Sequence, residues 1–206
     1  MRIVLIFIFL CQFIPVFPAH FKHIGMGDGL SQTSVMSIHQ DILGRMWFGT
    51  REGITVYDGN TTVVYKPWTD EMDREPTKSL FGNQCDFIRS NREGDVFFRT
   101  DAALMRYDIR KQEFRMVRSS GVRTLSTYKG DIWCVAEDSI FTYDPAGDSL
   151  QFRTKTNVQS IFCMLVLSEN KIWLGSNKGL YLMENGATPE VIIPDKDIYS
   201  LFESST

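Results

Sequence analysis

The segment GRMWFGTREGITVYD, which runs from Gly44 to Asp58, recurs along the chain and decides how it folds. Three further segments align with it over the same fifteen positions without a gap. They are GDVFFRTDAALMRYD from Gly94, GDIWCVAEDSIFTYD from Gly130 and NKIWLGSNKGLYLME from Asn170. Their starts lie 50, 36 and 40 residues apart. Self-similarity at a period of about 40 residues indicates a repeat architecture.

Several columns of this alignment are matched in all four repeats. The fourth column is aromatic and holds Trp47, Phe97, Trp133 and Trp173. The seventh and tenth columns hold small residues, and the eleventh is aliphatic. An aromatic ring can fill the wedge between neighbouring sheets, and a small residue suits a tight turn. We interpret these columns as determinants of core and turn rather than as ligand contacts.

Each repeat is expected to fold as four short strands. In the first repeat these are Ser34–His39, Met46–Thr50, Ile54–Tyr57 and Thr61–Tyr65. Gly44 allows the first tight turn by adopting a positive φ, and Asp58-Gly59 is a hairpin-turn signal. Four antiparallel strands make one blade of a β-propeller. The fold class predicted is therefore all-β, with no segment of helical period after the N-terminus.

The first nineteen residues are typical of a secretory signal peptide. Met1-Arg2 is a short basic start, Ile3–Leu10 is an unbroken apolar run, and Ala19 is a small residue suited to cleavage. The run is too short to span a bilayer comfortably. We predict that residues 1–19 are removed together with Cys11, and that the remaining chain is periplasmic or secreted. A buried N-terminal strand is the alternative.

Composition and charge exclude several classes of function. The formal net charge of -3 gives no basic surface for nucleic acid. The remaining cysteines, Cys85, Cys134 and Cys163, are odd in number and show no CxxC spacing. This pattern favours buried free thiols over a disulfide framework or a metal site. No cofactor and no further membrane span are implied.

The first repeat and the segment before it resemble the two-component regulator propeller repeat. The resemblance is carried by Asp28–Val35, Ile38–Asp41 and Gly44–Ile54, which follow that repeat's order of GL, V, I, D, G, WxGT and a closing glycine with an aliphatic residue. The last repeat, Ile172–Leu180, is another good match. The middle repeats depart from it: Arg99 and Val135 replace the glycine that follows the aromatic strand, and Phe97 replaces the tryptophan.

The resemblance implies a role in signal transduction. Such repeats form seven-bladed propellers in the N-terminal periplasmic part of hybrid two-component sensors. A β-sandwich, a membrane helix, a histidine kinase and a DNA-binding regulator follow in those proteins, and the ligands are glycan-derived oligosaccharides. A short opening strand at Phe21–Ile24 would close the ring with the last blade. The implied partners are an oligosaccharide and either the rest of the sensor or a second protomer.

The repeats cover residues 20–206 as a partial propeller. We expect blade units around 34–65, 84–117, 121–154 and 158–193, with a fifth blade beginning near Asp197. The remaining blades and the kinase are expected to lie outside this sequence, so we interpret the chain as a fragment. A truncated gene product or a mis-split reading frame would read the same way. A fragment of this kind would carry no signalling output and no kinase activity.

The sequence offers no catalytic constellation and only positional hints of a binding site. The three histidines form no motif, and His39 is expected to line the central channel. Loops on the face that joins the blades are the candidate ligand contacts: Arg51, Glu52, Trp68, Asp101, Asn177 and Lys178. Two alternatives stay open, a secreted protein-interaction module and a propeller lyase or hydrolase that uses His39.

Overall fold

The structure is a computed structural model that describes residues 22–67 and 76–204. In these ranges, sixteen β-strands form four antiparallel sheets of four strands each, and neighbouring strands in every sheet are consecutive in the chain. The all-β class and the four-stranded blades predicted from the sequence are therefore confirmed. No helix in the described ranges is long and apolar enough to cross a membrane. The predicted signal peptide, residues 1–19, lies outside them.

The strands divide evenly among the four blades. The first blade holds β1 (Val35–Gln40), β2 (Met46–Thr50), β3 (Gly53–Tyr57) and β4 (Thr62–Tyr65). The second holds β5 (Cys85–Ser90), β6 (Val96–Thr100), β7 (Ala103–Asp108) and β8 (Glu113–Ser119). The third holds β9 (Val122–Tyr128), β10 (Asp131–Ala136), β11 (Ser139–Asp144) and β12 (Ser149–Lys155). The fourth holds β13 (Ile161–Ser168), β14 (Lys171–Ser176), β15 (Gly179–Glu184) and β16 (Glu190–Pro194). Two short 3-10 helices, η1 (Met26–Asp28) and η2 (Pro76–Lys78), precede the first and second blades.

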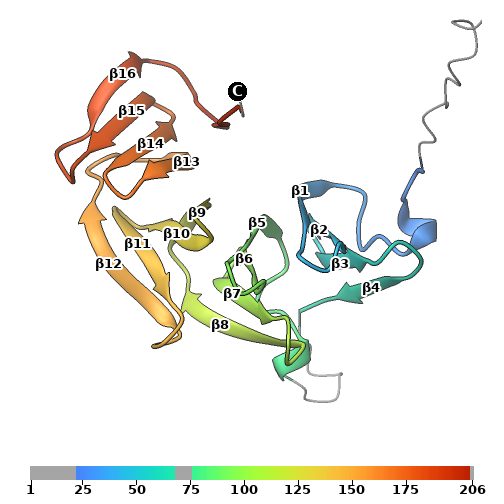
Figure 1. The fold of residues 1–206 in the computed structure, drawn as a ribbon. Helices are drawn as coiled ribbons and strands as arrows, with labels where there is room; N and C mark the ends of the chain where they lie inside the picture. The colour runs from blue at the N-terminus through green and yellow to red at the C-terminus, as the bar shows by residue number, and fades with distance from the viewer. Residues whose placement is uncertain (1–21, 68–75, 205–206) are drawn as a thin grey trace, which may run out of the picture.

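The blades follow one another around an open arc (Figure 1). The first strand of each blade lies toward the inside of the curve and the fourth toward the outside. Because the chain reverses at every hairpin, the turns fall on two faces. The face that carries the turns after the first and third strands of each blade is called the lower face. The upper face carries the middle turns and the connections between blades.

The aromatic column of the repeat fills the wedge between blades. Trp47 packs edge-on against Tyr107 of the second blade, with ring centroids 5.1 Å apart. Phe97 packs in the same way against Tyr143 of the third blade, at 4.7 Å. Trp133 shares a buried cluster with residues of the fourth blade. The aromatic residue in the fourth column of one blade thus packs against the following blade. Its partner there, Tyr107 or Tyr143, is the tyrosine of the fourteenth column.

The small residue of the seventh column closes the turn between the second and third strands. The hydroxyl of Thr50 accepts a hydrogen bond from Glu52 N–H at 3.0 Å and donates to Gly53 O at 3.0 Å. Thr100 and Ser176 make the corresponding bonds in the second and fourth blades. These contacts are local to each turn, so the column has a structural role.

The glycine of the sixth column lets neighbouring inner strands approach each other. A Cβ on Gly49 would lie 2.4 Å from the carbonyl oxygen of Cys85 in β5. On the fourth blade, Gly175 has the same place and its neighbour is Ile198, whose N–H donates to Ser176 O at 3.0 Å. Residues 196–204 are not in a strand, and Ile198 also accepts a hydrogen bond from Cys163 Sγ through its carbonyl oxygen at 3.4 Å. The segment predicted to begin a fifth blade therefore docks on the fourth blade without extending its sheet.

The segment before the first blade differs from the prediction. Residues 22–24 are not in a strand, so the predicted opening strand at Phe21–Ile24 is wrong in the part that the structure describes. A strand requires a neighbouring edge for its backbone groups, and this segment has none there. The chain instead lies against the first blade, where Leu30 and Ser31 are buried and Ser31 N–H donates to Thr55 Oγ1 at 2.8 Å.

Candidate ligand site in the central depression

The upper ends of the inner strands together form a depression in the middle of the arc. Successive side chains of a strand point to opposite faces of the sheet. The first residues of β5, β9 and β13 are buried, so the second residue of each of these strands points to the other face of its sheet. The second residues of the four inner strands are Met36, Asp86, Arg123 and Phe162. These four side chains, with Tyr199 from the C-terminal segment, line one cavity of about 630 Å³. One repeat position therefore contributes to the depression from every described blade.

Positive charge dominates the lining of this depression. Arg89, Arg99 and Arg123 line it, and Asp86 is the carboxylate among its described lining residues. Arg99 Nε donates to Asp86 Oδ1 at 2.7 Å, and Arg99 Nη1 donates to the carbonyl oxygen of Arg123 at 2.9 Å. The ion pair neutralises Arg99 within the second blade, and the hydrogen bond to the Arg123 carbonyl joins Arg99 to the inner strand of the third blade. Arg89 and Arg123 leave the depression with excess positive charge.

Aromatic rings form one wall of the depression. Phe162 and Tyr199 stack nearly parallel, with centroids 5.0 Å apart and an angle of 12° between the rings. Tyr199 is 69% exposed, so part of this stack faces solvent. In the second blade, the guanidinium carbon of Arg99 in β6 lies 4.9 Å from the ring centroid of Phe87 in β5. Exposed aromatic faces beside hydrogen-bond donors suit a ligand that has both apolar and polar faces.

The backbone is distorted where it borders the depression. Phe87 has a φ of 51°, a left-handed conformation that is unusual for a residue other than glycine. The pairing of β5 with β6 shifts between Asp86 and Arg89, which marks a bulge at this point. Ser160, just before β13, also lines the depression and has a φ of 50°. Bulges and strained residues of this kind are over-represented at functional sites, where they redirect side chains.

Half-buried polar groups below the depression tie the first two inner strands together. His39 Nε2 and Ser90 Oγ form a hydrogen bond of 2.7 Å between β1 and β5. Burial, and then the nearby charge of Arg89, lower the pKa of His39 from its ordinary value. Burial also lowers the pKa of Arg89, whose Nη1 donates to Ile88 O at 2.8 Å. A neutral imidazole that bonds a serine therefore explains His39 as a structural residue.

The described lining of the depression places one carboxyl group there. Glycoside hydrolysis needs two carboxyl groups facing each other across the bond. Asp86 is the carboxylate among the described lining residues, and Arg99 holds it in an ion pair. In the described ranges, no group of three or more His, Cys, Asp or Glu residues is placed to hold a metal ion. The described side chains can bind a ligand through aromatic rings and guanidinium groups, together with the backbone.

The site residues predicted from the sequence lie elsewhere on the upper face. Arg51 and Glu52 occupy the turn after β2, and Asn177 and Lys178 occupy the equivalent turn after β14. Asp101 accepts a hydrogen bond from Asn83 N–H at 2.7 Å and so stabilises the chain entering β5. None of these five residues is among those that line the central depression. Trp68 lies outside the described residues. Their role in binding stays a prediction.

A departure from the repeat pattern could have located the depression. Arg99 stands in the column where Gly49 and Gly175 bring inner strands together. A long cation at that position has to extend between two inner strands, and here it meets Asp86 and the carbonyl of Arg123. From the sequence alone, Arg99 is only a departure from the repeat pattern.

Comparisons with known proteins support the repeat assignment. Residues 29–52 match the family model "Two component regulator propeller". A 46-residue stretch is 48% identical to Histidine kinase P4 of Formosa agariphila, and it covers 22% of this chain and 3% of that protein. The resemblance to two-component regulator propeller proteins inferred from the sequence is therefore confirmed, and this chain spans a small part of the curated relative.

Solved structures share the fold. The extracellular domain of a hybrid two component system from B. thetaiotaomicron matches with a TM-score of 0.70 at 20% identity, over 84% of this chain and 26% of that one. An auxiliary nutrient binding protein from Bacteroides ovatus matches with a TM-score of 0.57 at 15% identity, over 81% of this chain and 43% of that one. At these identities the likeness establishes the propeller fold, and this chain spans less than half of each structure.

Proposed function

We propose that this chain is the ligand-sensing propeller portion of an exported two-component sensor, and that its central depression binds a glycan-derived oligosaccharide. The observation that carries the proposal is the convergence of one repeat position from four inner strands on a single depression. In a ring or arc of blades, the inner strands of several repeats face the same centre, so one ligand bound there can contact several repeats at once.

The chemistry of the depression matches an oligosaccharide. Sugar rings have apolar CH faces that stack on aromatic side chains, and Tyr199 with Phe162 offers such a face. Guanidinium groups donate several hydrogen bonds in a fixed geometry, which suits hydroxyl and ring oxygens. Arg89 and Arg123 stand on two different inner strands of the same depression. Binding would therefore link neighbouring blades.

Export and signalling are part of the same proposal. The apolar N-terminal segment and the likeness to extracellular domains support a periplasmic or secreted location. The signalling output would come from sequence outside this chain. Trp173 of the fourth blade is half-buried, whereas Trp47, Phe97 and Trp133 are covered by the following blade. The rest of the sensor or a second protomer would cover Trp173.

Calorimetric titration with a panel of neutral and acidic oligosaccharides tests the proposal. We expect one class of oligosaccharide to bind, and Tyr199→Ala to weaken that binding by about three- to tenfold, because it removes the exposed ring of the stack. Phe202→Ala is the matched control. It removes a ring of the same segment that is 86% exposed and does not line the depression.

The titration also separates the two alternative functions. An absence of binding to every glycan would refute the ligand proposal and favour a protein-interaction module. Turnover of a polysaccharide that is lost in His39→Gln would show a catalytic propeller instead. Equal weakening by Tyr199→Ala and Phe202→Ala would place the ligand outside the central depression.

A further inference from the structure

The first blade holds a buried carboxylate between an indole and a guanidinium group. Asp41 Oδ2 accepts hydrogen bonds from Trp47 Nε1 at 2.8 Å and from Arg45 Nε at 2.7 Å. The guanidinium carbon of Arg45 lies 5.6 Å from the centroid of the Trp47 ring. The side chain of Asp41 is fully buried. Trp47, Arg45 and Asp41 therefore form a complete carboxylate-binding unit in which the protein supplies its own carboxylate.

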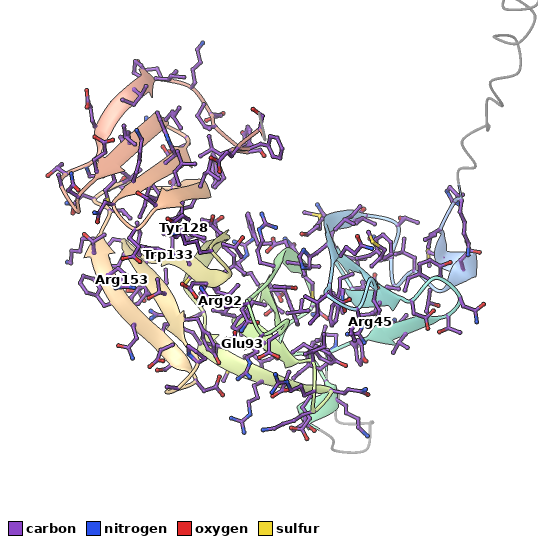
Figure 2. All side chains as sticks on the ribbon, in the orientation of Figure 1. Arg45, Arg92, Glu93, Tyr128, Trp133 and Arg153 are labelled. Atoms are coloured by element: carbon purple, nitrogen blue, oxygen red, sulfur yellow. The ribbon has the colours of Figure 1, made fainter. Side chains whose placement is uncertain are left out.

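In the third blade an indole and a guanidinium group again lie together, but the guanidinium comes from β12 and no carboxylate bonds the indole in the described residues. Trp133 is the residue that aligns with Trp47, and the guanidinium carbon of Arg153 lies 5.6 Å from its ring centroid, the same separation as in the first blade. Trp133 is only 3% exposed, yet its Nε1 has no hydrogen-bond acceptor in the described part of the chain. The alignment places Thr127 where the first blade has Asp41. Figure 2 shows the two units on different blades, with Arg45 in the first and Trp133 and Arg153 in the third.

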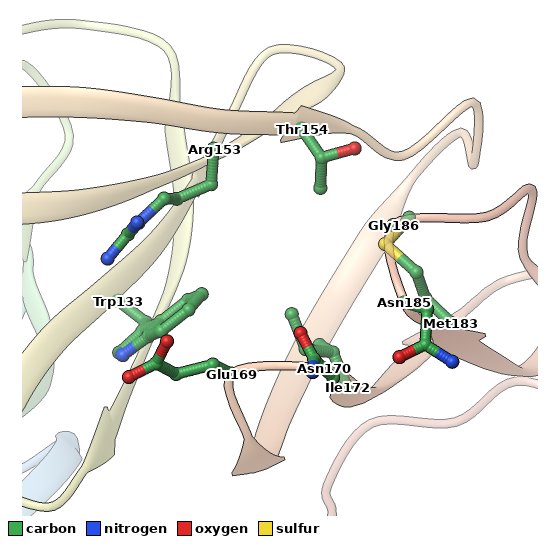
Figure 3. Close-up of a pocket in the computed structure, with 9 residues that line it drawn as sticks. All are labelled: Trp133, Arg153, Thr154, Glu169, Asn170, Ile172, Met183, Asn185 and Gly186. Atoms are coloured by element: carbon green, nitrogen blue, oxygen red, sulfur yellow. The ribbon is translucent and has the colours of Figure 1, made fainter.

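The unpartnered indole lies at the wall of a pocket. Trp133 and Arg153 line a cavity of about 260 Å³ between the third and fourth blades, away from the central depression, with which it shares no lining residue. Figure 3 shows Arg153, Trp133 and Glu169 on one side and Asn185 across the pocket, with Asn170 between them. Thr154 adds a hydroxyl from β12. The pocket thus combines a cation, an indole N–H and the carboxylate of Glu169 at one end with neutral amides and a hydroxyl at the other.

We propose that this pocket binds a hexuronate, a sugar acid whose carboxylate takes the place that Asp41 occupies in the first blade. A buried donor without an acceptor is costly, and an anion beside both a guanidinium and an N–H relieves that cost. The Nε of Arg153 already donates to Thr142 Oγ1 at 3.0 Å, which fixes the orientation of the guanidinium plane. The amides of Asn170 and Asn185 can both donate to and accept from sugar hydroxyls. The cavity has room for about one sugar ring.

Glu169 is the competing occupant. Its carboxylate lines the same pocket, and in the described structure it is exposed and forms no ion pair with Arg153. Like charges repel, so a bound hexuronate would have to coexist with Glu169 or displace it. Glu169→Gln should therefore strengthen hexuronate binding. If Glu169 were itself the acceptor for Trp133, the same variant would disturb Trp133 before any ligand is added.

The indole N–H resonances of the four tryptophans give a direct readout. The purified protein is labelled with ¹⁵N, Trp133→Phe assigns the Trp133 signal, and D-galacturonate, D-glucuronate and neutral D-galactose are titrated separately. We expect one of the two hexuronates to shift the Trp133 indole signal and galactose to leave it in place. We expect Arg153→Met to weaken that binding at least about tenfold, since it removes a charged hydrogen-bond donor.

Arg45→Met is the matched control, because Arg45 faces the same kind of indole but its site is already filled by Asp41. It should leave hexuronate binding unchanged. The proposal is overturned by a Trp133 response to galactose equal to that of the hexuronates, by no response to either hexuronate, or by a shift of the Trp133 signal in ligand-free Glu169→Gln. If Arg153→Met unfolds the protein, the comparison of hexuronate with galactose on the unsubstituted chain still tests whether the pocket binds a hexuronate.

Discussion

Trp47 and Trp133 occupy the same column of the repeat but should differ in what they contribute to stability. Both side chains are buried, at 0% and 3% exposure, and both lie 5.6 Å from a guanidinium carbon. The difference is that Trp47 Nε1 donates to Asp41, whereas Trp133 Nε1 has no acceptor in the described residues. Substitution by phenylalanine therefore removes a hydrogen bond from a buried carboxylate only at Trp47.

The expected difference in unfolding free energy comes from the hydrogen bond of Trp47, because the cost of the smaller ring is common to both variants. Loss of the larger ring leaves a cavity and costs each variant about 1–3 kcal/mol in the free energy of unfolding. A hydrogen bond to a charged group adds about 1.5–3 kcal/mol. Asp41 keeps Arg45 and two backbone N–H donors, so the lower end applies. We expect Trp47→Phe to destabilise the protein by at least about 1.5 kcal/mol more than Trp133→Phe, because Trp133→Phe also removes a buried donor that has no acceptor in the described residues.

Urea unfolding followed by far-ultraviolet circular dichroism measures this difference. With a urea dependence of about 2 kcal/mol per molar, the midpoint of Trp47→Phe should lie at least about 0.7 M below that of Trp133→Phe. Trp173→Phe, at a half-buried position on the fourth blade, should have the smallest effect of the three. Equal midpoints for Trp47→Phe and Trp133→Phe, or a lower midpoint for Trp133→Phe, would refute the reasoning.

Three further predictions concern pH, thiol chemistry and packing. Burial and a nearby arginine lower the pKa of His39 from its ordinary 6.5. The contribution of His39 to stability is therefore complete above about pH 6.5 and is lost as the pH falls through the lower pKa of the folded state. Between about pH 7.5 and 5, the thermal midpoint should drop less in His39→Gln than in the unsubstituted protein. Burial raises the pKa of Cys134 to about 12 and that of Cys163 to about 11, so these thiols should resist a thiol reagent at pH 8 until urea unfolds the protein, and rapid labelling of the native state would contradict the burial. A Cβ on Gly49 would meet backbone at 2.4 Å, so Gly49→Ala should lower the unfolding free energy by about 1–3 kcal/mol, whereas Gly27→Ala, with open space around it, should leave the urea midpoint unchanged.

The blades and their packing were predictable because their signals are local and repeated. An aromatic residue at a fixed distance from a glycine turn recurs in four segments, and strand alternation then places it in the wedge between blades. The turn hydroxyls of Thr50, Thr100 and Ser176 act within a few residues of themselves. The predicted opening strand failed because a strand depends on an edge elsewhere in the chain.

The candidate sites were not predictable in the same way. The five predicted loop residues that the structure describes are exposed. The depression is instead lined by the second residues of the inner strands, which lie outside the fifteen aligned columns. Arg99 was visible as an exception in the glycine column. Its meaning depended on Asp86, which lies thirteen residues away on the neighbouring strand.

By itself, the sequence determined that GRMWFGTREGITVYD and its three relatives are blades, because hydrophobic alternation and turn residues act over short distances. Only the tertiary structure decided which side chains meet. The rotation from one blade to the next brings Met36, Asp86, Arg123 and Phe162 to one centre, although long stretches of chain separate them. The same holds for Trp47 and Trp133, which match in sequence but differ in whether a carboxylate reaches the indole. That difference depends on the turn that precedes each strand and on the strand that packs beside it.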